Sequence, residues 1–417
     1  KIMIKILHLS DIHLGSGFSH GQIDPETGLN TRFLDFSRSL EKCIDRAVGI
    51  DSSPVDLVLF TGDAFPDATP PPYVHEAFAE QFRRLVDANI PTVLLVGNHD
   101  QHSQGSGGAS LSIYRTLVVP GFIVGDRINT YKIETANGEI QIITIPWLTN
   151  STLFTTQKTE GLSTAEVNEL LLKTLEPIIE SEIRQLDPSI PTILIGHLMA
   201  DRAALGAERF LAVGKGFTIP ISLLNRSELA YVGLGHVHKH QNLNKENNPP
   251  IVYPGSIERV DFSEEKEDKG YVIVEIEDKR VNWQFCPLKV RPFVTIKVNV
   301  SEKDDPHQAI LDEIAKHQIE NNVVRLIYTV NPAQLELIEL ASINEELSTA
   351  HSYTIRAELL SQLSRPRIPD LDPHQSIDPV TALETYLKTK DELKDLADDM
   401  IEATKQLLEM DKALDLR

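Results

Sequence analysis

Residues 91–100 read PTVLLVGNHD, an apolar run that ends at Gly97 and is followed at once by Asn98, His99 and Asp100. Short apolar runs bounded in this way favour buried strands. The arrangement recurs in ILHLSDIH at 6–13, VDLVLFTGD at 55–63, TILIGH at 192–197 and YVGLGHVH at 231–238. In open α/β sheets, ligands gather at the carboxyl ends of the strands. The five stretches therefore predict strands whose polar residues converge on one site.

Segments with helical periodicity separate these strands. Apolar residues spaced three or four apart predict a helix over Arg32–Val48. Further helices are expected over Tyr73–Ala88 and from about Thr164 to Leu186, with further strands over Ile140–Ile145 and Tyr271–Ile276. Alternation of strands and helices predicts a layered α/β domain, which we place at residues 1–286.

Composition indicates a globular protein of a reducing compartment. The chain has 417 residues and a net charge of −21, an acidity that argues against nucleic-acid binding through charge alone. The only two cysteines, Cys43 and Cys286, are too far apart for a CxxC zinc site. No apolar run approaches the roughly 18 residues of a membrane span, and the first residues predict a strand rather than a signal peptide. We therefore expect a cytoplasmic protein.

The pattern changes after Pro287. Residues 290–300 and 323–330 are strand-like, whereas 305–317 and 331–342 have helical periodicity, which predicts a small α+β domain over residues 287–362. The Pro-rich stretch 363–378 predicts an extended linker. Leucines near helical spacing on a charged background then predict helices over 379–417, broken near Thr389–Asp391.

The polar residues that follow the strands suit transition metals. Carboxylate, amide and imidazole ligands together favour Mn²⁺, Fe²⁺ or Zn²⁺ over Mg²⁺ or Ca²⁺. A lone D-x-H or G-H pair would carry little weight, because a core histidine is the commoner explanation, but five motifs in order indicate a site. Seven ligands fit two ions bridged by a carboxylate, which can clamp a phosphate and activate a water. The expected ligands are Asp11, His13, Asp63, Asn98, His197, His236 and His238.

This order of motifs resembles the calcineurin-like metallophosphoesterases, and among them the SbcD branch of DNA-break-repair nuclease subunits. The resembling stretches are ILHLSDIHLG, RFLDF, LVLFTGDAF, VLLVGNHD, LAYVGLGHVHKHQ and IVYPGSIERVDFSEEKEDKGYVIVEI. The pattern PGS-x-x-R-x-x-F-x-E before KGY is typical of this branch rather than of phosphoesterases at large. The resemblance implies an α/β fold: a four-layer α/β/β/α sandwich, a smaller α+β capping domain that orients DNA, and a C-terminal helical partner-binding segment.

The resemblance also implies residue roles. Two Mn²⁺ ions are the expected cofactors, and Asp63 would bridge them. His99 would be the catalytic histidine that protonates the leaving oxygen, and Asp100 would hold the His99 imidazole in the right tautomer. One departure is Pro66, which stands where some family members have a histidine. The implied ligands are, for one ion, Asp11, His13 and His238, and for the other, Asn98, His197 and His236.

The activity implied by the resemblance is that of a DNA nuclease subunit in repair, recombination and replication. It would act as a 3′→5′ exonuclease at double-strand ends and as an endonuclease in single strands and hairpins. The helices of 379–417 would dock on the coiled-coil base of an SbcC-type ATPase, and the chain would form a homodimer within a heterotetramer. Candidate phosphate contacts, for which a solvated strand face is an equally good interpretation, are Arg291, Lys297, Arg325 and Arg356.

Other interpretations share the same core. A dinuclear phosphodiesterase acting on a small nucleotide is the main alternative, although cyclic-nucleotide enzymes lack the region after Pro287. The strings GDAFPDATP and GNHD differ from the GD-x-x-DRG and GNHE of protein phosphatases. A scaffold without chemistry is disfavoured because all seven ligands and His99 are present. A second departure is the long segment between Gly15 and Phe33, in which His20 is expected to be exposed to solvent.

Overall fold

The computed structural model describes residues 3–50, 52–101, 108–149, 163–204, 218–245, 249–277, 280–360, 379–388, 397–398 and 400–405. The predicted linker 363–378 and the predicted break at Thr389–Asp391 lie outside them. The chain divides into two compact units, and the predicted domain boundaries at 286 and 362 stay predictions. The first unit consists of Lys1–Ile296, Lys316–Leu326 and Asn344–Ile355, and the second of Lys297–Ala315, Ile327–Ile343 and Arg356–Arg417.

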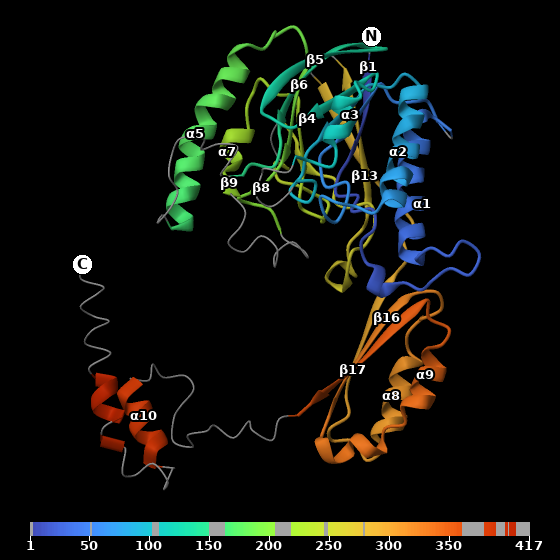
Figure 1. Cartoon of the computed structure of the whole chain (residues 1–417), viewed down its shortest axis with the longest axis vertical. Coiled ribbons are helices and arrows are strands. Elements are labelled where there is room, and N and C mark those ends of the chain that lie inside the picture. The colour runs from blue at the N-terminus through green and yellow to red at the C-terminus, as the bar shows by residue number, and fades with distance from the viewer. Residues whose placement is uncertain are drawn as a thin grey trace. The chain divides into compact units, whose positions relative to one another are not determined.

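Two six-stranded sheets form the centre of the first unit. The strands of the first sheet, in chain order, are β1 (Met3–Leu9), β2 (Leu57–Phe60), β3 (Thr92–Leu95), β4 (Phe122–Gly125), β13 (Gly270–Glu277) and β14 (Arg280–Pro287). Those of the second are β5 (Asn129–Thr135), β6 (Gly138–Ile145), β7 (Thr192–His197), β10 (Tyr231–Gly235), β11 (Gln241–Asn242) and β12 (Ile251–Tyr253). Across the sheets the orders are β14-β13-β1-β2-β3-β4 and β11-β12-β10-β7-β6-β5 (Figure 1).

Helices cover the outer face of each sheet. Against the first sheet pack α1 (Thr31–Val48) and α2 (Pro72–Asp87), and against the second pack α5 (Thr164–Arg184) and α7 (Ile221–Leu224) (Figure 1). Smaller elements are the one-turn 3₁₀ helices Phe18–His20 and Phe262–Glu264, α3 (Ser112–Thr116), and the strand pair β8 (Met199–Ala200) and β9 (Thr218–Ile219).

Burial on both faces explains why the strands read as unbroken apolar runs. Along β1, Ile6 faces a core between the two sheets, whereas Leu7 and Leu9 pack with the helices α1 and α2. In the second sheet, Ile193 of β7 lies in the core between the sheets and Leu194 packs in the core that contains α5. Three apolar cores thus separate four layers, and the expected α/β/β/α sandwich is confirmed.

Helix ends follow from local capping chemistry. The Asn30 side chain accepts a hydrogen bond from the Arg32 N–H at the start of α1, and Gly49 adopts a left-handed conformation at its end. Ser163 and Glu166 form a reciprocal capping box at the start of α5. These caps fix where α1 and α5 begin, each within one residue of the predicted start.

The region after Pro287 contains β15 (Phe293–Asn299), α8 (Pro306–Ile314), β16 (Val323–Val330), α9 (Leu340–Leu347) and β17 (Ser352–Leu359), with the sheet order β15-β16-β17. The prediction of one helix over 331–342 is wrong. Pro332–Leu337 is a 3₁₀ helix, and Ile338 is extended at φ −97 and ψ 114, so α9 begins only at Leu340. Strand β17 was not predicted. In the C-terminal segment, α10 spans Pro379–Lys388.

His20 contradicts the expectation of a solvent-exposed loop histidine. Its ring is half-buried and packs edge-on against Phe262 and Phe293, with ring centroids 5.3 and 5.5 Å away. The sequence offered no sign of these partners, which lie far along the chain. Among the helices that the structure describes, none is long and apolar enough to cross a membrane.

Candidate metal centre

The site forms where the parallel strands β1, β2, β3, β7 and β10 end. Asp11, His13, Asp63 and His236 all have positive φ, at 50, 45, 59 and 97 respectively. Such backbone is costly for residues other than glycine, and it persists where surrounding structure holds it. Here the Asp11 N–H donates to Gly62 O at 3.0 Å and the His13 N–H to Asp63 O at 3.1 Å. The backbone bends sharply at the ligands and thereby turns their side chains into the site.

One group of ligands consists of Asp11, His13 and His238. Each offers a ligand atom, and these atoms all lie within 4.8 Å of one another. The Nε2 atoms of His13 and His238 face each other at 3.0 Å. All three side chains are buried, so the structure brings together the three residues that the resemblance implied for one ion.

A second group consists of Asp63, His197 and His236, whose ligand atoms also lie within 4.8 Å of one another. The Asn98 Oδ1 atom is 3.0 Å from both His197 Nε2 and His236 Nδ1, which completes the set implied for the other ion.

Asp63 reaches both groups. Its Oδ2 atom lies 3.4 Å from His197 Nε2 and 3.6 Å from His13 Nε2. A carboxylate in this position can be shared by two cations. The bridging role predicted from the sequence is therefore geometrically available, and all seven predicted ligands converge.

Electrostatics fits the same interpretation. Burial lowers the pKa of His13 well below its ordinary value, and burial and the nearby His197 lower the pKa of His236 to about 3. Burial also disfavours charge on His197, but the Asp63 and Asp11 carboxylates outweigh it and raise its pKa to about 9. Neutral imidazoles bind metal ions, so a cation held by Asp63 and His197 would take the place of the proton that the carboxylates favour on His197. His236 Nε2 is buried with no hydrogen-bond partner. The donor set fits two divalent cations.

His99 lies at the rim of the site, and its orientation corrects one prediction. The His99 Nδ1 atom is 2.7 Å from Pro66 O, and its ring centroid is 5.0 Å from that of His13. Asp100 was expected to orient His99. Instead its carboxylate accepts hydrogen bonds from the backbone N–H groups of Gly97, Asp63 and Ala64, at 2.9 to 3.0 Å.

Asp100 therefore joins two loops of the site rather than two members of a catalytic pair. The turn of a GNHD motif points successive side chains in different directions, so adjacency in sequence did not produce the expected contact. Burial and the nearby Asp63 raise the pKa of Asp100 to about 6, although its backbone donors act in the opposite direction.

Gly97 is required by close packing. A Cβ atom on this residue would lie 2.1 Å from Asp63 Oδ1 and 2.5 Å from Asp63 N. Because no side chain fits there, the glycine allows the GNHD turn to approach the shared carboxylate. Gly235, before His236, is equally constrained, since its Cβ would lie 2.1 Å from Thr61 O.

Two residues near the ligands were missed by reasoning from the sequence. The Trp147 ring centroid lies 4.9 Å from that of His236, although the sequence indicated only a packing role for this tryptophan. Glu264 Oε1 lies 2.7 Å from His238 Nδ1. Glu264 is the last residue of the PGS-x-x-R-x-x-F-x-E pattern. The sequence showed this pattern but did not indicate that its glutamate contacts a ligand.

Two of the four candidate DNA contacts are engaged inside the first unit. Arg291 donates to both carboxylate oxygens of Asp35 at 2.8 Å. The Arg325 guanidinium lies over the Phe262 ring, 4.3 Å from its centroid. Both side chains therefore have partners within the protein, and their role as phosphate contacts stays a prediction. Arg356 lies 3.5 Å from Glu358, with 71% of its side chain exposed.

Comparison with known proteins agrees with the fold and the ligand set. Residues 4–240 match the model of the calcineurin-like phosphoesterase family. The chain is 26% identical to the SbcD subunit of the SbcCD nuclease from Staphylococcus epidermidis over 323 residues, covering 76% of this chain and 77% of that protein. It is 25% identical to the corresponding protein of Staphylococcus saprophyticus over 321 residues, covering 76% of each.

Among solved structures, a dimetal phosphatase from Danio rerio is 11% identical. The aligned region covers 68% of this chain and 96% of that chain, with a TM-score of 0.42. The family model, in contrast, spans more than half of the chain and includes all of the ligand-bearing strand ends. The chain belongs to the calcineurin-like phosphoesterase family and is a hydrolase of phosphate esters.

Proposed function

We propose that this protein is a metal-dependent DNA nuclease subunit that acts in DNA repair and recombination, in the cytoplasm. It hydrolyses phosphodiester bonds at double-strand ends as a 3′→5′ exonuclease, and in single strands and hairpins as an endonuclease. The observation that carries the proposal is the convergence of two ligand groups on Asp63 in a chain similar to SbcD subunits over three quarters of its length.

The ligand groups divide the work of holding two ions. Asp11, His13 and His238 would hold one, and His197, His236 and Asn98 the other, with Asp63 common to both. Two divalent ions bound there supply positive charge to a phosphate and lower the pKa of a water. Mn²⁺ suits the mixture of imidazole nitrogen and carboxylate or amide oxygen, and we propose it as the native metal.

His99 is proposed as the proton donor. When its Nδ1–H donates to Pro66 O, the ring is held by backbone and its Nε2 edge remains for the substrate. In the imidazolium form, that edge can protonate the leaving oxygen as the phosphodiester bond breaks. Pro66 would contribute through its carbonyl, which any residue possesses, so the absent family histidine does not remove this contact.

The proposed partner is an SbcC-type ATPase, bound on its coiled-coil base through the helices of 379–417. This rests on the similarity to SbcD subunits and on the leucine pattern of that segment. In helix α10 (Pro379–Lys388), Leu387 is buried, with 3% of its side chain exposed. We further propose a homodimer within a heterotetramer, and DNA ends as the shared substrate.

The deciding experiment is an assay on an end-labelled hairpin duplex with Mn²⁺, with and without the partner ATPase and ATP. The expected result is shortening from the 3′ end and opening of the hairpin, both abolished by EDTA and stimulated by the ATPase. A chelated sample to which Mn²⁺ is restored is the control. Hydrolysis of small cyclic or dinucleotides without any attack on DNA would overturn the proposal in favour of the small-nucleotide phosphodiesterase.

A further inference from the structure

We infer that residues 254–270, which we call the signature segment, form a cradle for the metal ligand His238, with Glu264 as the positioning residue. The segment contains the PGS-x-x-R-x-x-F-x-E pattern and the following Lys269. The inference rests on the metal centre of the proposed function but not on DNA as its substrate.

Glu264 fixes the side chain of His238. Its Oε1 atom lies 2.7 Å from His238 Nδ1, and its Oε2 atom lies 2.8 Å from Lys269 Nζ and accepts from the Val260 N–H at 3.0 Å. With Nδ1–H donating to this carboxylate, Nε2 is the atom left to bind an ion. Glu264 is fully buried, and three partners fix its direction.

The signature segment also holds the main chain of His238. The His238 carbonyl accepts from the Ser256 N–H at 3.0 Å and from Lys269 Nζ at 3.2 Å. Gly255 has φ 82, and a Cβ there would lie 2.6 Å from His238 O. Lys269 therefore contacts both the His238 carbonyl and the carboxylate that orients its ring. Both the backbone and the imidazole of one ligand are held by one short segment.

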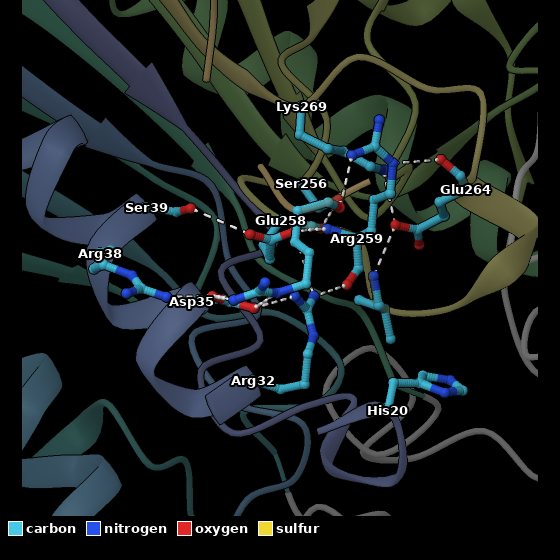
Figure 2. Close-up of polar contacts among 12 residues, drawn as sticks. His20, Arg32, Asp35, Arg38, Ser39, Ser256, Glu258, Arg259, Glu264 and Lys269 are labelled. Atoms are coloured by element: carbon cyan, nitrogen blue, oxygen red, sulfur yellow. Dashed lines mark hydrogen bonds and ion pairs between the residues drawn. The ribbon is translucent and has the colours of Figure 1, made fainter. Parts of the chain in front are cut away.

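Arg259 closes the cradle from outside. Its guanidinium donates to the carbonyls of Glu264 at 3.2 Å and Glu267 at 2.8 Å, which holds the loop around the carboxylate. The Arg259 carbonyl in turn accepts from Arg32 of α1 at 2.7 Å (Figure 2). Arg259 also donates to the Arg291 carbonyl at 3.2 Å, so this residue ties the cradle to α1 and to the chain beyond β14.

The second ligand group is held differently. His197 Nδ1 lies 2.7 Å from the Thr61 carbonyl, a neutral acceptor, and its Nε2 faces Asn98. A carboxylate behind a ligating imidazole raises its basicity, whereas a carbonyl does so less. Loss of the Glu264 charge should therefore weaken binding of the ion held by Asp11, His13 and His238 and leave binding of the other ion unchanged.

The test measures Mn²⁺ binding to metal-free protein by calorimetry and by the EPR signal of coupled and isolated Mn²⁺. Glu264→Gln keeps the shape and removes the charge, and Glu264→Ala removes the acceptor. We expect one of two sites to weaken about 10–100-fold, with alanine the stronger change, and the other site to stay within about twofold. The matched control is Glu265→Gln and Glu265→Ala, since this neighbouring carboxylate accepts from the Thr295 N–H and not from a ligand.

Two backgrounds identify the affected ion. In the His236→Ala background, which disables the second ligand group, Glu264→Gln should still weaken Mn²⁺ binding at the first group. In the His13→Ala background, which disables the first ligand group, Glu264→Gln should leave Mn²⁺ binding at the second group unchanged. Equal weakening in both backgrounds, or Glu264 variants that bind both ions as the wild type does, would overturn the inference.

Folding of the variants is checked by thermal unfolding without metal. In Glu264→Gln, Lys269 keeps Glu267 at 2.9 Å and the His238 carbonyl but loses its buried ion pair with Glu264, so this variant should melt below the wild type and still be folded at the temperature of the binding assay. A melting point that falls while both ions still bind normally would assign Glu264 a merely structural role and reject the inference. Failure of DNA cleavage would leave these binding results unaffected, so the two proposals fail separately.

Discussion

At the scale of single residues, the site depends on where side chains are aimed. His99 and Asp100 are neighbours in sequence, yet the His99 ring lies against Pro66 O whereas the Asp100 carboxylate binds three backbone N–H groups. Asp63, which comes from a different loop, is the residue that lies close to both ligand groups. Substitutions at adjacent positions should therefore have different consequences.

We predict that His99→Ala keeps both ions and loses DNA cleavage. Removal of a proton donor typically costs about 10²–10⁴-fold in rate. The measurement is single-turnover cleavage of a labelled duplex at saturating Mn²⁺, with Mn²⁺ stoichiometry as the control. A cleavage rate equal to that of the wild type would show that His99 does not donate the proton.

We predict that Gly97→Ala damages the metal centre and the fold together. The new Cβ would lie 2.1 Å from Asp63 Oδ1, so Asp63 or the turn must move, at a cost of about 1–3 kcal/mol in the free energy of unfolding. Calorimetric Mn²⁺ binding and thermal unfolding would detect this.

The control for Gly97 is Gly28→Ala. Gly28 has φ 71 and no atom within 4 Å of its Cβ position, so only the left-handed backbone penalty of about 1–2 kcal/mol should appear. Normal Mn²⁺ binding by Gly97→Ala would contradict the packing argument.

At the scale of elements, apolar periodicity predicted the helices and strands whose buried residues recur at a regular spacing along the chain. The helix over 32–48 and the strand over 192–195 were recognisable because their neighbours along the chain already show the pattern. Strand β14 (Arg280–Pro287) was missed although its polar and apolar residues alternate as expected of an edge strand with one half-buried face. The 3₁₀ helix at Pro332–Leu337 was predicted as part of a longer helix because its composition is helical, whereas the extended backbone of Ile338 ends it early.

The same limit applies to the site. All ligands could be named because each follows an apolar strand, whereas Glu264 and Trp147 act through contacts made only after folding. Arg291 looked free in the sequence because its partner, Asp35, is 256 positions away. Long-range pairs of this kind carry no local signal.

At the element scale we predict that Asp35→Asn destabilises the first unit in a pH-dependent way. Asp35 in α1 is 6% exposed and accepts from Arg32, Arg38 and Arg291, so loss of its charge should cost about 3 kcal/mol at neutral pH. Burial acts to raise the pKa of Asp35, but Arg291 and Arg32 outweigh it and hold the pKa below its usual value.

Because the folded pKa is depressed, the stability from this charge is fully present above the unfolded pKa of about 3.9 and is lost as pH falls through the folded pKa. The melting points of wild type and Asp35→Asn should therefore differ at pH 7 and converge below about pH 4. Exposed Asp268→Asn is the control. A difference that persists unchanged in acid would contradict the electrostatic origin.

At the scale of the whole molecule, the acidity of the chain has a local component. Residues 370–417 carry 13 acidic and 6 basic residues, and this stretch includes the segment proposed to bind the ATPase rather than DNA. Divalent ions at the metal centre would reverse the sign of charge around the buried carboxylates. The net charge of −21 therefore does not exclude a nuclease, but we expect its DNA affinity to be weak without the partner.

We predict that truncation after Leu363 abolishes binding to the ATPase and leaves Mn²⁺-dependent hydrolysis of a small phosphodiester within about twofold. The metal ligands all lie before residue 240, so the active site does not need the tail. A pull-down with the partner ATPase and an assay on bis-p-nitrophenyl phosphate measure the two effects. Retention of the ATPase by the truncated chain would reject the docking proposal.

The facing Nε2 atoms of His13 and His238 belong to residues 225 positions apart in the chain. During synthesis, the N-terminal half can therefore form its own strands, but it contains no complete ligand group until His236 and His238 have been added. Loops of this length close slowly, so the centre is expected to form late in folding. A nascent chain would then be inactive until its second sheet has docked on the first. Variants in which this docking is slow would resemble variants that lack a metal ligand, although every ligand is present.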